Sequence, residues 1–335
     1  MVKSSAFRPK AQPSVTDNPY PIRMSVASPG SLRMTPINPL AYPHKAVLGL
    51  FHVDWPWIAG EYRTGPVPGT SWTFMASNAV TGRYEVLGHF YPNGLSMADG
   101  TLAWTTGTFA PKGGPVSAWI QTFNLKNWTK GRMAYTTKPG VYYAFPTISQ
   151  GRVVFTRLTP HAVHPIWDLI LLHPSTGSLT DLTHNWVTKG TDGSGISTEP
   201  ALWDGYLLFK QAPSPTSLGD IDLWKLGGTK YPLWQQNGRA WKVDGFGEGP
   251  MFGDGLAAWQ ARGQGTIGIL DLSRGAMWDV QNPAKVGVKG DYKNAWFFES
   301  VNGRDILVKR YTFKTDSYKY FIWRMPAVCR AGRKS

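Results

Sequence analysis

A ten-residue phrase recurs along the chain, and this repeat limits the possible folds more than any other feature of the sequence. Each of the clearest copies begins with a proline and reaches an Asp-Gly or Gln-Gly pair four residues later. It then continues into a short apolar run that ends on an aromatic residue. The clearest copies are Pro146–Phe155, Pro200–Phe209 and Pro250–Trp259. A phrase repeated at a nearly constant period indicates one supersecondary unit that is used several times.

Three weaker copies complete the series: Asp54–Ala59, Asp99–Trp104 and Lys293–Phe298. The copies follow one another at about 40–55 residues, the length of a four-stranded propeller blade. A second turn behind another apolar run follows each phrase, and the runs of about four to eight residues are typical of β-strands. The sequence therefore predicts an all-β protein, a six-bladed β-propeller of four-stranded antiparallel blades.

The repeat resembles that of a known family. Pro250–Trp259 has the pattern of a proline, an Asp-Gly turn and an aromatic-ended apolar run, and Ile269–Gly275 adds a second turn of the form apolar-x-Asp-Leu-x-x-Gly. Together they resemble the blade repeat of the TolB-like (WD40-like) β-propellers, over roughly residues 51 to 325. The resemblance implies a fold and no particular activity, because many unrelated functions share such folds.

The apolar runs that follow the turns are expected to form the innermost strands of the blades. These runs are Leu102–Trp104, Val153–Phe155, Leu207–Phe209, Leu256–Trp259 and Ala295–Phe298. Phe155, Phe209 and Trp259 end their runs at the same distance from the turn. We therefore expect these three rings to be buried at equivalent positions between blades.

Three segments are expected along the chain. Residues 1–44 hold eight prolines and predict an extended, basic, Pro-rich arm, because closely spaced prolines exclude a helix or a central strand. Residues 45–325 form the propeller, with a strand at 45–51 closing the last blade, and residues 326–335 form a basic tail. On this interpretation, removal of residues 1–40 leaves the stability of the ring nearly unchanged.

The net charge of +14 is unevenly distributed, because most of it lies in the first 50 and the last 32 residues. Ring closure brings the two ends of a propeller to one seam, so these segments are expected to form a positive patch that binds another protein. The residues expected to bind the partner are Arg8, Lys10, Tyr20, Arg23, Arg33, Arg330, Arg333 and Lys334. The single cysteine, Cys329, excludes an intrachain disulfide.

Few residues have the spacing of a chemical site. His161, His164 and Asp168 form one local cluster that could ligate a metal, but flanking prolines place the histidines in a loop, where an exposed loop is the simpler interpretation. Asp220 and Asp222 lie two residues apart on a strand and share a face, which suits acid/base chemistry or a charged blade edge. We expect no metal and no cofactor.

The aspartates beside the turn glycines, Asp99, Asp204 and Asp254, are expected to bond turn backbone rather than to catalyse. No nucleophile elbow, zinc-protease motif or phosphate-binding glycine loop occurs in the sequence. Several tryptophans fall near predicted loops: Trp128, Trp186, Trp203, Trp234, Trp241 and Trp278. Some of them could serve as stacking platforms or interface anchors, whereas roughly two thirds are expected to pack between blades.

These features favour a non-catalytic propeller that acts as a protein–protein assembly module, most concretely a structural component of a bacteriophage virion docked by its arm. The alternative is a carbohydrate-binding or carbohydrate-active propeller that uses the mouth of the central channel. Nucleic acid is not expected, because the arm has no Arg/Lys run and the body is nearly neutral. Without an apolar signal segment or a membrane-spanning run, the expected location is the cytoplasm or a virion.

Overall fold

The computed structural model shows an all-β protein. It describes residues 23–27, 33–37, 47–64, 71–89, 93–109, 115–160, 166–173, 176–183, 198–211, 219–226, 230–232, 242–243, 250–260, 266–281, 295–312 and 317–324. No helix occurs within these ranges, and accordingly none of them holds a helix suited to crossing a membrane.

The first three sheets each contain four consecutive antiparallel strands. Sheet 1 consists of β3 (Val47–Asp54), β4 (Trp57–Thr64), β5 (Ser71–Asn78) and β6 (Tyr84–Gly88). Sheet 2 consists of β7 (Asn93–Ala98), β8 (Thr101–Phe109), β9 (Pro115–Asn124) and β10 (Thr129–Thr136). Sheet 3 consists of β11 (Tyr142–Ser149), β12 (Arg152–Thr159), β13 (Ile166–His173) and β14 (Ser178–Asp181).

The other three sheets depart from this plan at their outer sides. Sheet 4 contains β15 (Thr198–Trp203), β16 (Tyr206–Gln211), β17 (Gly219–Lys225) and β18 (Lys230–Pro232), and β19 (Lys242–Val243) also pairs with β17. Sheet 5 contains β20 (Met251–Phe252), β21 (Leu256–Gln260), β22 (Thr266–Asp271) and β23 (Ala276–Gln281), with β1 (Arg23–Ala27) parallel to β23. Sheet 6 contains β24 (Ala295–Asn302), β25 (Asp305–Thr312) and β26 (Ser317–Arg324), with β2 (Arg33–Ile37) antiparallel to β26.

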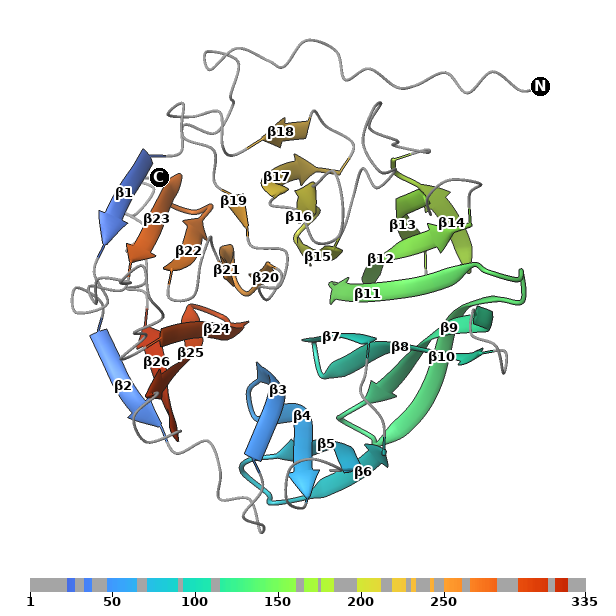
Figure 1. The fold of residues 1–335 in the computed structure, drawn as a ribbon, viewed down its shortest axis with the longest axis horizontal. Coiled ribbons are helices and arrows are strands. Elements are labelled where there is room, and N and C mark those ends of the chain that lie inside the picture. The colour runs from blue at the N-terminus through green and yellow to red at the C-terminus, as the bar shows by residue number, and fades with distance from the viewer. Residues whose placement is uncertain are drawn as a thin grey trace, which may run out of the picture.

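The sheets stand around a common centre, as in a β-propeller, with the first strand of each sheet nearest the middle (Figure 1). Each of these inner strands contacts the inner strand of the next sheet, and β24 contacts β3. In three places a hydroxyl of one inner strand accepts a hydrogen bond from the backbone N–H of the next. The pairs are Ser96 with Ile148 (3.3 Å), Thr147 with Leu202 (3.0 Å) and Ser300 with Val53 (3.3 Å).

The repeated turn joins the first and second strands of a sheet. Asp99 and Gly100 have φ angles of 55° and 72°, and Asp204 and Gly205 have 45° and 76°. Two successive positive φ angles are the requirement of the two-residue hairpin turn that matches strand twist, and Asp-Gly adopts it readily. The Asp-Gly pair therefore sets this hairpin from local sequence alone.

The expectation that the runs after the turns are the innermost strands is wrong for the four runs on β8, β12, β16 and β21, which are second strands. The strand before the turn is innermost, as the Ala295–Phe298 run of β24 is. Pro146 and Pro200 lie on these inner strands at breaks in the pairing register. An inner strand is the edge strand of its sheet, so it tolerates proline and bulges. The second strand carries the continuous apolar run, which requires burial on both of its faces.

The expected closing strand at 45–51 is also wrong. Residues 47–54 form β3, which pairs with β4 through the two-residue turn after Asp54 and so belongs to sheet 1. So short a connection leaves no chain length to reach another sheet. The strand that completes sheet 6 is β2, and β1 extends sheet 5, so part of the predicted free arm is built into the sheets (Figure 1).

The hydrophobic core lies between neighbouring sheets. Phe155, Phe209 and Trp259 are each fully buried on the second strand of their sheet, which confirms their predicted burial. Phe155 packs with Ile120 of sheet 2, and Phe209 packs with Leu169 of sheet 3. Each ring thus fills the space against the preceding sheet, and these contacts hold the ring of sheets together.

Candidate functional site

The turns between first and second strands bring acidic and aromatic side chains to one end of the ring. Asp54 Oδ2 accepts a hydrogen bond from Gly100 N at 2.8 Å, and Asp99 Oδ2 accepts one from Gln150 N at 2.9 Å. Each bond joins the turn of one sheet to the turn of the next. The structural role predicted for Asp99 is therefore confirmed, although its partner belongs to another sheet.

This end of the ring also concentrates negative charge. Burial raises the pKa of Asp54, and the charges of Asp99 and Asp254 raise it as well, against the lowering effects of the Gly100 hydrogen bond and Lys126. Trp55, in the turn next to Asp54, has 63% of its surface exposed. An exposed indole can stack on a sugar ring, and carboxylates beside it can accept hydrogen bonds from the hydroxyls of that sugar.

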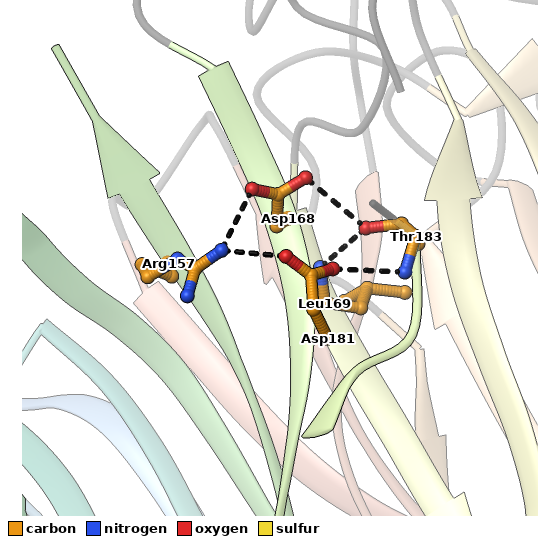
Figure 2. A network of polar contacts seen from close by, with 5 residues as sticks. All are labelled: Arg157, Asp168, Leu169, Asp181 and Thr183. Carbon is orange, nitrogen blue, oxygen red and sulfur yellow. Dashed lines mark hydrogen bonds and ion pairs between the residues drawn. The ribbon is translucent and has the colours of Figure 1, made fainter. Parts of the chain in front are cut away.

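A second polar cluster lies within sheet 3 (Figure 2). Arg157 Nη2 on β12 donates to Asp168 Oδ2 at 3.1 Å and to Asp181 Oδ2 at 2.6 Å. Thr183 Oγ1 donates to Asp168 Oδ1 at 3.4 Å and accepts from Leu169 N at 2.9 Å. The Asp168 side chain is 1% exposed. Its buried carboxylate links β13 to Arg157 of β12 and to Thr183, which follows β14, and these partners compensate for the burial of its charge.

The geometry of this cluster does not support the hypothesis of a metal site at His161, His164 and Asp168. Asp168 is engaged by Arg157 and Thr183, while His161 and His164 lie outside the described residues. Among the residues that the structure describes, no three metal-ligating side chains come together. Asp220 and Asp222 lie on β17, but their side chains are outside the described part.

A third polar cluster surrounds Asp271 on β22 and links sheets 5 and 6. Burial by itself raises the pKa of Asp271, but hydrogen bonds from Arg304 and Ser273, and the charges of Arg304 and Arg274, outweigh it and leave the pKa below its usual value. Ser273 Oγ donates to Asp271 Oδ1 at 2.5 Å, and Arg304, from the turn after β24, donates to both carboxylate oxygens. Sequence reasoning missed this link because its members come from different repeats.

His52 lies on the inner strand β3 and is 5% exposed. Burial without a charged partner lowers its pKa from 6.5 to about 4. The unfolded chain therefore binds a proton at a higher pH than the folded protein does. We expect the free energy of unfolding to fall by about 3 kcal/mol as the pH drops from 7 to 4 because of this one group. Urea denaturation at a series of pH values measures the slope.

Two variants separate this effect from general acid destabilisation. His52→Gln should flatten the slope between pH 7 and 4, because the variant has no imidazole to protonate. His173→Gln is the matched control, since His173 is exposed at the end of β13. Equal slopes for His52→Gln and the parent protein would contradict the prediction.

The residues predicted to bind a partner are placed in part. Arg23 begins β1 and Arg33 begins β2, on the outer sides of sheets 5 and 6. Arg33 is opposite Arg324 in the β2–β26 pair, and Arg324 donates to both oxygens of Asp305 at 2.8 and 2.7 Å. The others lie outside the described residues: Arg8, Lys10, Tyr20, Arg330, Arg333 and Lys334.

The tryptophans predicted near loops do not form a platform in the described part. Trp128 packs edge-on against Phe123, and Trp203 stacks on Tyr206. The side chains of the other four lie outside that part: Trp186, Trp234, Trp241 and Trp278. At the turn end the exposed indole is that of Trp55. The sequence did not predict its position in a two-residue turn, because Trp55 belongs to a degenerate copy of the repeat.

Comparison with known proteins gives similarity of fold. No family model and no curated protein matches the chain. Solved structures similar to it include the β-propeller domain of the Trilobed protease from Pyrococcus furiosus, with 10% identity over 83% of this chain and 95% of that chain and a TM-score of 0.48. TolB from Acinetobacter baumannii matches with 13% identity over 80% and 63% and a TM-score of 0.47.

An acylaminoacyl peptidase from Pyrococcus horikoshii matches at 11% identity and a TM-score of 0.47, over 83% of this chain. The chain spans about half the length of that peptidase, 51%. The predicted resemblance to TolB-like β-propellers is thus found among solved structures, as a likeness of fold alone.

Proposed function

We propose that the chain is a non-catalytic six-bladed β-propeller that acts as a protein-binding module, with the basic segments at its two ends docking on an acidic face of another subunit. Sheets 1 to 6 would be the six blades. The contact of β24 with β3 and the hydrogen bond from Val53 N to Ser300 Oγ support closure of the ring between its first and last blades.

The β2–β26 pair is the observation that carries the binding role. It sets Arg33 against Arg324, so the chain leaves the last described strand beside the point where β2 begins. Arg330, Arg333 and Lys334 follow shortly after Arg324 in the sequence. We define the basic seam as Arg23 and Arg33, which begin β1 and β2, together with Arg330, Arg333 and Lys334 of the sequence after β26. An acidic surface is the complementary partner, since opposite charges steer association and fix orientation.

The described carboxylates support a binding role rather than catalysis. Asp99, Asp168 and Asp271 each accept hydrogen bonds that join strands or sheets. A carboxylate that accepts a structural hydrogen bond is a poor general base, because the fold sets its orientation and occupies the oxygen that would take a proton. The turn-end residues Asp54 and Trp55 favour the second candidate, a carbohydrate-binding propeller.

One experiment compares the two candidates. The partner that co-purifies with the native protein is tested for binding to three variants at 50 and 300 mM salt. In the seam variant, Arg330, Arg333 and Lys334 become glutamate. In the matched control, exposed Lys138, Arg152 and Lys225 become glutamate. The third variant is Trp55→Ala. We expect binding to weaken at high salt and to be lost in the seam variant alone.

Retention of binding by the seam variant at both salt concentrations would refute the docking role. Loss of binding in Trp55→Ala alone, with a glycan as the captured partner, would support the carbohydrate-binding candidate instead. The bacteriophage virion identity stays a prediction, which detection of the chain in purified particles would test.

A further inference from the structure

The outer edges of the sheets are not equally covered. The chain's own segments β1 and β2 add to the outer strands of sheets 5 and 6, one parallel and one antiparallel. In sheet 2 the outer strand β10 pairs with β9 on one side, and no described strand pairs with its other side. β10 has eight residues, against five, four and three for the outer strands β6, β14 and β18.

One face of β10 combines positive charge with aromatic rings. Lys130, Arg132 and Tyr135 are opposite Phe123, Gln121 and Trp119 on β9, respectively. These pairings, with a bulge at Ala134, put the three β10 side chains on the same face of the sheet.

Two rings orient the Arg132 side chain. Its guanidinium carbon lies 4.4 Å from the Trp119 ring centroid and 5.4 Å from that of Tyr135. A guanidinium held over aromatic faces keeps the N–H groups at its edge available. Two of these N–H groups can bind one carboxylate together. Arg132 and Lys130 are exposed, and no carboxylate in the described ranges forms an ion pair with either of them.

We propose that β10 accepts an extended segment of a partner protein as an added strand, and that this segment carries acidic residues at alternate positions. Lys130 and Arg132 are two residues apart, which on a strand is about 6.8 Å. Alternate carboxylates on an added strand have the same spacing and meet the two cations as direct cross-strand neighbours. Main-chain hydrogen bonds to the open edge supply affinity, and the charge pairs supply register.

The same features exclude other occupants. Cationic side chains and a bulge on an edge strand oppose indiscriminate strand pairing, and a basic strand opposite Lys130 and Arg132 is repelled. A second copy of this chain, with a net charge of +14, is a poor match for the edge. Strands β1 and β2 show that outer edges of this fold do accept added strands.

The probe is a capped eight-residue peptide in which glutamate alternates with threonine, tested by fluorescence anisotropy on the full chain. Three control peptides accompany it: lysine alternating with threonine, the same glutamates in one block, and the alternating peptide with N-methylated backbone. We expect the alternating acidic peptide alone to bind and to slow amide exchange along β10. Arg132→Glu should weaken binding at least about fivefold, and exposed Lys138→Glu should not.

The block peptide or the N-methylated peptide could instead bind as tightly as the alternating acidic peptide. Either result would mean that unspecific charge attraction explains the binding, and it would overturn the proposal. Unchanged binding by Arg132→Glu would overturn it as well. Amide exchange of the free variant verifies that β10 remains folded. The seam variant, Arg330→Glu with Arg333→Glu and Lys334→Glu, should bind the peptide normally, so failure of the seam as a docking site leaves this result unaffected.

Discussion

Truncation of Trp259 to alanine is expected to lower the free energy of unfolding by about 3–5 kcal/mol, as deletions of buried aromatic side chains do. Trp259 is fully buried and packs with Leu208 and Leu223 of sheet 4 and with Leu270 and Met277 of its own sheet. Loss of the ring therefore opens a cavity at the contact between two sheets. Urea denaturation of both proteins at pH 7 measures the difference.

The matched control is another tryptophan. Trp55→Ala removes a side chain that is 63% exposed, so the free energy of unfolding should change by less than about 1 kcal/mol. Gly268→Ala tests the same contact from the opposite strand, because a Cβ at Gly268 would overlap the Trp259 indole. A loss below about 1 kcal/mol in Trp259→Ala would mean that the two sheets do not pack through this ring.

Truncation from the amino terminus gives the second large effect. Removal of residues 1–40 deletes β1 and β2 and should lower the free energy of unfolding by an amount on the order of 5 kcal/mol, because two sheets lose the hydrogen bonds of an outer strand. The sequence alone predicted no change for this deletion, since it placed the closing strand at 45–51. Differential scanning calorimetry measures the shift in melting temperature.

Two shorter deletions separate the strands. Removal of residues 1–22 keeps both strands and should leave the melting temperature unchanged. Removal of residues 1–30 deletes β1 alone and should give an intermediate shift. A synthetic peptide of residues 1–40, added to the longest truncation, should restore stability by pairing with β23 and β26. An unchanged melting temperature after removal of residues 1–40 would show that neither strand contributes.

The repeat predicted the local structure well because its signals act over a few residues. An Asp-Gly pair such as Asp204-Gly205 adopts the positive φ angles of a two-residue turn wherever it occurs. A run such as Leu207–Phe209 is apolar on both faces, so both faces have to be buried, as they are in the structure. From these signals follow the hairpins, the buried aromatic rings and the likeness to TolB-like propellers.

The candidate sites were less accessible to sequence reasoning. Asp168 was considered as a metal ligand, but its partners are Arg157 on the neighbouring strand β12 and Thr183 just after β14. Arg132 had no distinguishing motif, and its value as a binding group depends on the Trp119 and Tyr135 rings that orient it. Such groups are defined by cross-strand neighbours, which strand register determines.

The amino-acid sequence by itself determined the class of fold, the turns and the aromatic residues of the core, because each depends on backbone preference or on apolar character within one repeat. The tertiary structure alone decided which strand of each repeat is innermost and which segment completes the last sheet. Pairing of β2 with β26 joins residues at opposite ends of the chain. Sheet 6 is completed by β2 and not by residues 45–51, because a short turn pairs β3 with β4. Local pairing thus competes with pairing between distant segments, and the outcome is seen only in the assembled structure.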